Sequence, residues 1–114
     1  MRWVTIHTTS PLERADRVEI ETLAVEVIDG ADVGLKVEAD SEELTIGTAA
    51  NNDLELSDPT VSGYHLELTQ REDGIHLSDL GSTNGTFVGN IRIRNGIIPP
   101  GTTIQLGRSS ICVV

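Results

Sequence analysis

The strongest constraint on the fold is a period of two in the apolar residues between positions 44 and 68. Leucine or isoleucine alternates with polar residues in three short runs, at 44–46, 54–56 and 66–68. Clusters of Gly, Asn, Asp, Pro and Ser separate these runs, and such residues favour tight turns. Because successive side chains of a strand point to opposite faces, each run predicts a short strand with one buried face. The segment therefore predicts strands joined by polar loops.

The same kind of pattern continues on both sides of this segment. Residues 23–37 predict a hairpin that turns at 29–32. Gly89-Asn90 predicts a two-residue hairpin turn, and Asn95-Gly96 predicts another turn. No stretch keeps a helical period over three turns. We therefore expect an all-β fold, a sandwich of two packed sheets with about ten or eleven short, mostly antiparallel strands.

Alternation also predicts which side chains form the core. One apolar residue in every two should point between the sheets, because the other face of each strand meets solvent. The predicted core residues are Leu23, Val25, Leu35, Val37, Ile46, Leu54, Leu56, Leu66, Leu68, Leu77, Phe87, Ile104, Leu106 and Val113.

Length and composition bound the domain organisation. The 114 residues suit one domain. Residues 1–21 are polar and weakly patterned, so we expect an arm or linker that can add an edge strand, followed by one domain at 22–114. Charges at positions 13, 14, 16 and 17 argue against a signal peptide or a membrane span. The single Cys112 cannot close an intrachain disulfide, which fits a reducing, cytoplasmic location. Because the chain stops in an apolar run at 111–114, we expect one module of a longer protein.

The charge disfavours some partners. Eight Lys and Arg stand against eighteen Asp and Glu, which gives a net charge of −10. Such a chain repels phosphate backbones and anionic lipid surfaces, so we expect neither direct nucleic-acid contact nor membrane binding. From Val37 to Gln70 there is no Lys or Arg at all. An anion-binding loop in this segment would have no cation of its own.

Five short motifs follow one another through the patterned region. They are Ile46-Gly47, Asn52-Asp53, LELSD at 54–58, Val61-Ser62 with His65, and GSTNGT at 81–86. In this order and spacing they resemble the forkhead-associated (FHA) family, and the resemblance runs from about Leu23 to the end of the chain. It implies a phosphothreonine-binding β-sandwich. The loops at one end of the sandwich, here called the apex, would carry the ligand site.

The resemblance implies roles for particular loop residues. Ser62 matches the family's phosphate-contacting serine, whose hydroxyl and backbone amide can both donate to an anion; the alternative is a loop residue that caps its own turn. Thr83 and Asn84 match the pair that holds the peptide main chain near the phosphothreonine, although Asn84-Gly85 is also an ordinary turn dipeptide. His65 is expected to tie the apex loops together by hydrogen bonds. The residues expected to shape the loops are Gly47, His65 and Gly85.

Two positions depart from the family pattern. The family usually has Arg directly after the Ile-Gly pair, where this chain has Thr48, and very often Arg or Asn after the serine, where this chain has Gly63. Thr48 offers a hydroxyl in place of a guanidinium, and Gly63 offers only backbone. The candidate phosphopeptide-binding residues are therefore Thr48, Ser62, Gly63, Thr83 and Asn84.

Two functions are compatible with these residues. The first is a non-enzymatic interaction module of a larger signalling or transcription regulator, which recognises phosphothreonine weakly or not at all and binds a protein or another domain of the same chain. The alternative is a working phosphothreonine-peptide reader that uses Ser62, Thr48, Asn84 and backbone amides. The run from Ile46 to Ser62 also resembles FHA modules at the N-terminus of bacterial sigma-54-dependent activators, which would make the regulator a transcriptional one.

No catalytic or metal site is expected. Ser62, His65 and Asp58 carry the residue types of a hydrolase triad, but nothing indicates an oxyanion hole or a nucleophile elbow. His7, His65 and His76 lack the spacing of metal ligands. We therefore expect no enzyme activity, no cofactor and no metal.

Overall fold

The computed structural model of the protein describes residues 2–6 and 18–114, which form β-strands and loops. In these two ranges there is no helix, and so none long and apolar enough to cross a membrane. The strands are β1 (Arg2–Ile6), β2 (Val18–Thr22), β3 (Ala24–Asp29), β4 (Lys36–Glu38), β5 (Glu43–Gly47), β6 (Leu54–Glu55), β7 (Leu66–Arg71), β8 (Gly74–Asp79), β9 (Thr86–Val88), β10 (Ile91–Arg92), β11 (Asn95–Ile98), β12 (Thr103–Leu106) and β13 (Ser109–Val113).

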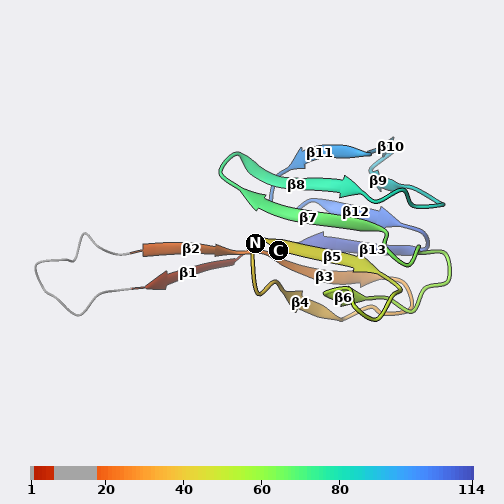
Figure 1. Ribbon diagram of the computed structural model, residues 1–114, viewed down its shortest axis with the longest axis horizontal. Coiled ribbons are helices and arrows are strands. Elements are labelled where there is room, and N and C mark those ends of the chain that lie inside the picture. Colours follow the sequence, from red (N-terminus) through yellow and green to blue (C-terminus); the bar gives the residue numbers. More distant parts are fainter. Residues whose placement is uncertain (1, 7–17) are drawn as a thin grey trace, which may run out of the picture.

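The strands from β3 to β13 form a two-layered sandwich (Figure 1). One sheet has six strands in the order β10-β9-β12-β13-β3-β4, and the other has five in the order β11-β8-β7-β5-β6. Strand β5 pairs with β6 in parallel, and the other pairs of the two sheets are antiparallel. The prediction of an all-β, mostly antiparallel sandwich of about ten or eleven strands is confirmed.

The hydrophobic core lies between the two sheets, as period-two alternation requires. Strand β5 shows the pattern, since Leu44 and Ile46 are fully buried while Glu43 is exposed. The buried core residues are Leu23, Val25, Val27, Leu44, Ile46, Leu54, Leu56, Val61, Leu66, Leu68, Ile75, Leu77, Ile98, Ile104, Leu106, Ile111 and Val113. All of the predicted core residues are among them except Leu35, Val37 and Phe87.

These three exceptions have local causes. Leu35 is 46% exposed, because it precedes β4 directly after Gly34, whose φ of +99° breaks the alternation. Val37 is only partly buried on β4, which is the edge strand of its sheet. Phe87 is also partly buried, because Thr86 is the residue of β9 that points inward. Prediction of Leu35 as a core residue was therefore wrong, and Val37 and Phe87 contribute less than expected.

The predicted turns are correct at one site and wrong at another. Ile91 pairs with Val88 across Gly89-Asn90, as expected of a two-residue hairpin turn. Asn95-Gly96 lies instead at the start of β11, opposite Ser78 and Leu77 of β8.

The two N-terminal strands form a hairpin of their own. Strand β1 pairs with β2 antiparallel, from Arg2 opposite Thr22 to Ile6 opposite Val18. Within the described ranges, neither strand pairs with the two sandwich sheets, and Figure 1 shows them projecting from one end of the sandwich. The predicted arm or linker at 1–21 lies partly outside the described residues, and the domain boundary at 22 stays a prediction.

The opposite end of the sandwich gathers the loops that follow β3, β5, β6, β8 and β12 (Figure 1). These loops contain the candidate site residues.

Candidate functional site

His65 joins two of the apex loops through both nitrogens of its fully buried ring. Its Nδ1 accepts a hydrogen bond from the Ser62 amide at 3.0 Å, and its Nε2 lies 2.8 Å from the Gly85 carbonyl oxygen. Because Nδ1 is the acceptor, Nε2 must carry the proton and donate to Gly85. The His65 backbone also donates to Ile46 and accepts from Leu80. The ring therefore fixes the loop that contains Ser62 against the GSTNGT loop.

Gly47 allows the loop after β5 to approach the Ser62 loop closely. A Cβ atom on Gly47 would lie 2.2 Å from the Gly63 carbonyl oxygen, which is a backbone atom and cannot move aside. The loops are joined there by hydrogen bonds from the Thr48 amide to Ser62 and from the Ala49 amide to Gly63. The need for glycine at 47 is thus steric, since its φ is not positive.

Asn52, in the loop after β5, stabilises the contact between this loop and the Ser62 loop. Its Nδ2 donates to the Gly63 carbonyl at 2.7 Å and to the Ala49 carbonyl at 2.9 Å, and the side chain is 8% exposed. The sequence marked Asn52 only as part of a motif, without a structural role. Its burial, which explains the need for these two hydrogen bonds, could not be read from the sequence.

Ser62, Thr83 and Asn84 come together at the apex. The Ser62 hydroxyl oxygen accepts a hydrogen bond from the Thr83 amide at 3.0 Å, and Asn84 Nδ2 donates to the Thr60 carbonyl at 2.8 Å. Ser62 is partly exposed, while Thr83 and Asn84 are exposed. The Ser62 hydroxyl keeps its own proton to donate. Its backbone amide donates to His65, and the role of Ser62 towards an anion stays a prediction.

Asp79 holds the GSTNGT loop in shape. One carboxylate oxygen accepts from the Gly81 and Ser82 amides, and the other accepts from the Ser82 and Thr86 hydroxyls at 2.6 and 2.7 Å. Burial raises the pKa of Asp79, but these hydrogen bonds outweigh it and lower the pKa below its ordinary value. Gly85 completes the turn with a φ of +88°. An Asp at a strand end, two residues before a turn-rich run, is a recognisable signal for such a cap.

Asp58 joins the Ser62 loop to the turn after β12. Its 3%-exposed carboxylate accepts from the Thr60 amide and hydroxyl, the Ser109 hydroxyl and the Arg108 amide, at 2.6 to 3.1 Å. Burial raises the pKa of Asp58, and these four hydrogen bonds more than offset that effect and lower it to about 2. The apex is therefore a set of loops locked by internal hydrogen bonds before any ligand arrives.

A model of the FHA domain family matches residues 44–107, which is more than half of the chain. The chain belongs to the FHA family. FhaB of Mycobacterium tuberculosis, an FHA domain-containing protein, is 31% identical over 86 residues, which cover 75% of this chain and 56% of FhaB. The chain thus spans just over half the length of this relative.

Solved FHA structures have the same fold. An FHA domain from a study of phosphothreonine-dependent FHA domain interactions is 31% identical, with a TM-score of 0.72 over 82% of this chain and 95% of that one. The FhaA FHA domain, complexed with the intracellular domain of Rv3910, is 32% identical, with a TM-score of 0.71 over 81% and 99% of the two chains.

The two departures from the FHA pattern adjoin Ser62 along the backbone, because the Thr48 amide donates to the Ser62 carbonyl and Gly63 follows Ser62 in the chain. Thr48 is partly exposed and lines a cleft of about 390 Å³, here called the Thr48 cleft, together with Asp32, Glu55, Leu56, Ser57, Pro59 and Val61. Gly63 is exposed, has no positive φ, and has open space where a Cβ would stand. Neither position brings a positive charge to the site, and the Thr48 cleft contains two carboxylates.

Ser62, His65 and Asp58 do not form a catalytic triad. Both ring nitrogens of His65 bond to backbone groups, and the Asp58 carboxylate bonds to Thr60, Arg108 and Ser109. A triad needs the imidazole between the serine hydroxyl and the carboxylate. Among the described residues, no group of three or more His, Cys, Asp or Glu side chains could hold a metal ion.

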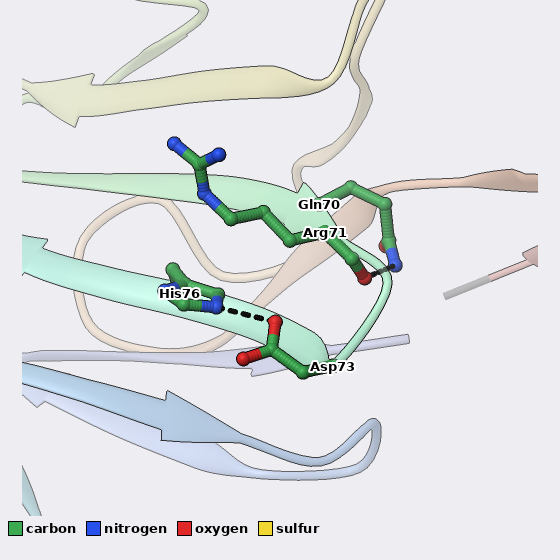
Figure 2. A network of polar contacts seen from close by, with 4 residues as sticks. All are labelled: Gln70, Arg71, Asp73 and His76. Atoms are coloured by element: carbon green, nitrogen blue, oxygen red, sulfur yellow. Dashed lines mark hydrogen bonds and ion pairs between the residues drawn. The ribbon is translucent and has the colours of Figure 1, made fainter.

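A second polar cluster lies far from the apex, at the turn between β7 and β8 (Figures 1 and 2). His76 Nε2 and Asp73 Oδ1 are 2.7 Å apart, and Gln70 Nε2 donates to the Arg71 carbonyl. The hydrogen bond with His76 lowers the pKa of Asp73. The cluster stabilises an exposed hairpin turn and takes no part in the apex.

Proposed function

We propose that this FHA domain is a protein-interaction module of a larger regulator, and that it recognises phosphothreonine weakly. In this proposal the Ser62 hydroxyl donates to the phosphoryl group, while Thr83 and Asn84 hold the peptide main chain. Thr48 and Gly63 stand where the family has side chains that contact the phosphorylated residue. Gly47, His65 and Gly85 keep the loops in their positions.

The observation that carries the proposal is the lack of a cation in the Thr48 cleft and throughout residues 37–70, which include Thr48, Ser62 and Gly63. A hydrogen bond to a charged group contributes about 1.5 to 3 kcal/mol. Two missing charge-assisted contacts therefore remove roughly 3 to 6 kcal/mol, or about two to four decades in dissociation constant. A micromolar reader would become a near-millimolar one. The two carboxylates of the Thr48 cleft act in the same direction, because they repel a phosphoryl group.

Titration with phosphothreonine peptides tests this proposal. In calorimetry at physiological salt, the protein should bind such peptides with dissociation constants no tighter than about 100 μM, because the charge-assisted contacts are lost. Ser62→Ala should weaken this binding further. The unphosphorylated peptides should show no binding that depends on Ser62. Binding at low micromolar concentration that Ser62→Ala abolishes would reject the proposal.

That outcome would support a second function, a working phosphothreonine reader. It would use the hydroxyls of Ser62 and Thr48, the Asn84 side chain and backbone amides. The observation that favours it is that hydrogen bonds hold Ser62 to Thr83 and Asn84 to Thr60, in a chain 31% identical to an FHA domain from a study of phosphothreonine-dependent interactions. A partner in another domain of the same chain, and attachment to a sigma-54-dependent activator, stay predictions that the full-length gene product would test.

A further inference from the structure

A cleft of about 300 Å³ lies between the end of β8 and the segment that runs from β10 to β11, and we call it the Arg92–Arg94 cleft. The lining residues are Asp79, Gly81, Ser82, Arg92, Arg94 and Asn95. None of them lines the Thr48 cleft, and Ser62, Thr83 and Asn84 are not among them. The cleft is therefore formed by other residues than the candidate phosphopeptide site.

Charge distinguishes this cleft within an acidic chain. Two of the eight Lys and Arg residues of the chain line it, and both are exposed. Asp79 is the one carboxylate of the lining, and its oxygens already accept four hydrogen bonds from the GSTNGT loop. The two guanidinium groups outnumber this carboxylate, so the lining has a net positive charge.

The backbone fixes both arginines where the chain crosses from one sheet to the other. Strand β10 belongs to the six-stranded sheet and β11 to the five-stranded one. The Ile93 amide donates to the Thr86 carbonyl at 2.8 Å, and the Asp79 amide donates to the Arg94 carbonyl at 2.7 Å. Ile93 packs against the core, while the arginines on either side of it are exposed. The base of the cleft is therefore held by hydrogen bonds and by the core.

Both guanidinium groups are available to a ligand. Gly85 leaves room for Arg92, because a Cβ atom on Gly85 would lie 2.8 Å from Arg92 Nε and 3.1 Å from Cζ. In the part of the chain that the structure describes, no ion pair and no hydrogen bond to the side chain of Arg92 or Arg94 occurs. A guanidinium can bind a carboxylate through two parallel hydrogen bonds.

The cleft continues into a sheet edge. Asn95 lines the cleft and is also the first residue of β11. Among the described strands, β11 pairs only with β8 and forms one edge of its sheet (Figure 1). Ile97 on this strand is 54% exposed. A strand edge can hydrogen-bond with the backbone of an extended segment, while the side chains of that segment provide specificity.

We propose that β11 and the Arg92–Arg94 cleft form a second docking surface, which binds an extended acidic segment of a partner protein whether or not the segment carries phosphothreonine. The segment pairs with β11 and places an Asp or Glu carboxylate in the cleft. The net charge of −10 does not prevent this, because salt screens distant charges beyond about 8 Å and the nearby cations dominate. The inference goes beyond the proposed function and does not depend on phosphothreonine recognition.

Fluorescence anisotropy with an unphosphorylated peptide tests this inference. The labelled probe has about ten residues, ~33 Å when extended, in which Glu alternates with Thr and Val. A matched peptide has Gln in place of Glu. The proteins are wild type, the double variant Arg92→Gln/Arg94→Gln, and Lys36→Gln/Arg71→Gln as the control. Lys36 and Arg71 are exposed and lie outside the cleft, so the control removes the same charge elsewhere.

At physiological salt, wild type should bind the Glu peptide about tenfold more tightly than the Gln peptide, because two partly exposed ion pairs contribute about threefold to fivefold each. Arg92→Gln/Arg94→Gln should lose this preference, whereas the control variant should keep most of it. Equal losses in the two variants would show a non-specific effect of charge and overturn the inference. The lack of measurable binding of the Glu peptide to wild type would overturn it too.

NMR spectra of the isotope-labelled protein locate the probe. The amides of residues 94–97 should shift on addition of the Glu peptide, and an excess of phosphothreonine peptide with an alanine background should not displace it. Shifts confined to the loop around Ser62, or displacement by the phosphothreonine peptide, would place the probe at the apex and overturn the inference.

Two further measurements exclude other occupants of the cleft. Free glutamate should compete far more weakly than the unlabelled Glu peptide, and sedimentation equilibrium should give the same molecular mass for wild type and Arg92→Gln/Arg94→Gln. Equal competition by free glutamate would show a site for small anions only. Self-association of wild type that the double variant abolishes would show a second copy of the chain as the occupant. Either result would overturn the docking of a partner segment.

Discussion

At the scale of single residues, the His65 side chain joins two apex loops by hydrogen bonds. Its buried ring meets a donor on one side and an acceptor on the other, and both are backbone groups of different loops. The loss of the ring would leave the partly buried Ser62 amide and the buried Gly85 carbonyl without these partners. An unsatisfied buried polar group costs about 1 to 3 kcal/mol.

We therefore predict that His65→Ala lowers the free energy of unfolding by about 1 to 3 kcal/mol. Equilibrium unfolding in guanidinium chloride measures this. His76→Ala is the matched control, because His76 is partly exposed and bonds only Asp73 at the far turn, so its loss should stay within about 0.5 kcal/mol. An unchanged midpoint for His65→Ala would show that the ring does not hold the loops.

Two glycines show what the sequence alone does not predict at this scale. Gly47 ends β5 and Gly63 lies in the loop after β6, and only the structure shows how their requirements differ. A side chain at 47 would meet the backbone of Gly63, whereas a side chain at 63 would meet nothing within 4 Å. The close approach depends on how two loops distant in sequence fold together, and no local pattern contains that information.

At the scale of elements, the Asp58 carboxylate determines where the β12–β13 turn lies. It joins Thr60 in one loop to Arg108 and Ser109 in another, about fifty residues further along the chain. Its pKa lies at about 2, below its ordinary value of 3.8. The stabilisation from the ionised form is therefore fully present above pH 3.8 and is lost as the pH falls through 2.

Asp58→Asn should lower the free energy of unfolding by about 1 to 3 kcal/mol at neutral pH, because the amide brings donors to a site filled by donors. The difference between wild type and variant should shrink as the pH falls from 3.8 towards 2. Denaturant midpoints across this pH range provide the measurement. Exposed Asp40, changed to Asn, controls for the loss of one negative charge. A difference that stays constant with pH would contradict the ionised hydrogen-bond network.

Strands were easier to predict than turns, for a physical reason. Alternation is repeated in each strand, so β5 and β7 could be identified from several residues at once. A turn signal is only two residues long. Asn84-Gly85 does turn the chain, with Gly85 at a φ of +88°, but Asn95-Gly96 is extended and pairs with β8. Pairing with β8 keeps Asn95-Gly96 extended.

At the scale of the whole molecule, the β1–β2 hairpin stands apart from the sandwich (Figure 1). Its strands pair with one another, while the core begins with Leu23 at 1% exposure. A two-stranded hairpin alone is marginally stable in water. The sandwich should therefore not depend on it.

Accordingly, a chain of residues 22–114 should fold, with a free energy of unfolding within about 0.5 kcal/mol of that of the whole protein. Guanidinium unfolding followed by circular dichroism compares the two. A substantially less stable shortened chain would show that residues before 22 belong to the domain.

The distribution of positive charge also belongs to the scale of the whole molecule. The proposed function depends on this distribution. The family motifs, the sandwich and the loop-joining hydrogen bonds are present, but the residues that line the Thr48 cleft include no cation. The sequence already indicated this gap, since residues 37–70 contain no Lys or Arg. It could not indicate that the β12–β13 turn brings Arg108 to the same cavity as Thr60 and Asn84.

The most direct test is to restore the missing cations and titrate a phosphothreonine peptide by calorimetry. Thr48→Arg alone, and together with Gly63→Arg, returns forked donors to the two family positions. Because Gly63 has no positive φ and open space around it, the second change should be tolerated by the loop. If phosphothreonine recognition is weak for want of cations, the double variant binds at least about tenfold more tightly than wild type. Equal affinities, with both proteins folded, would contradict the account.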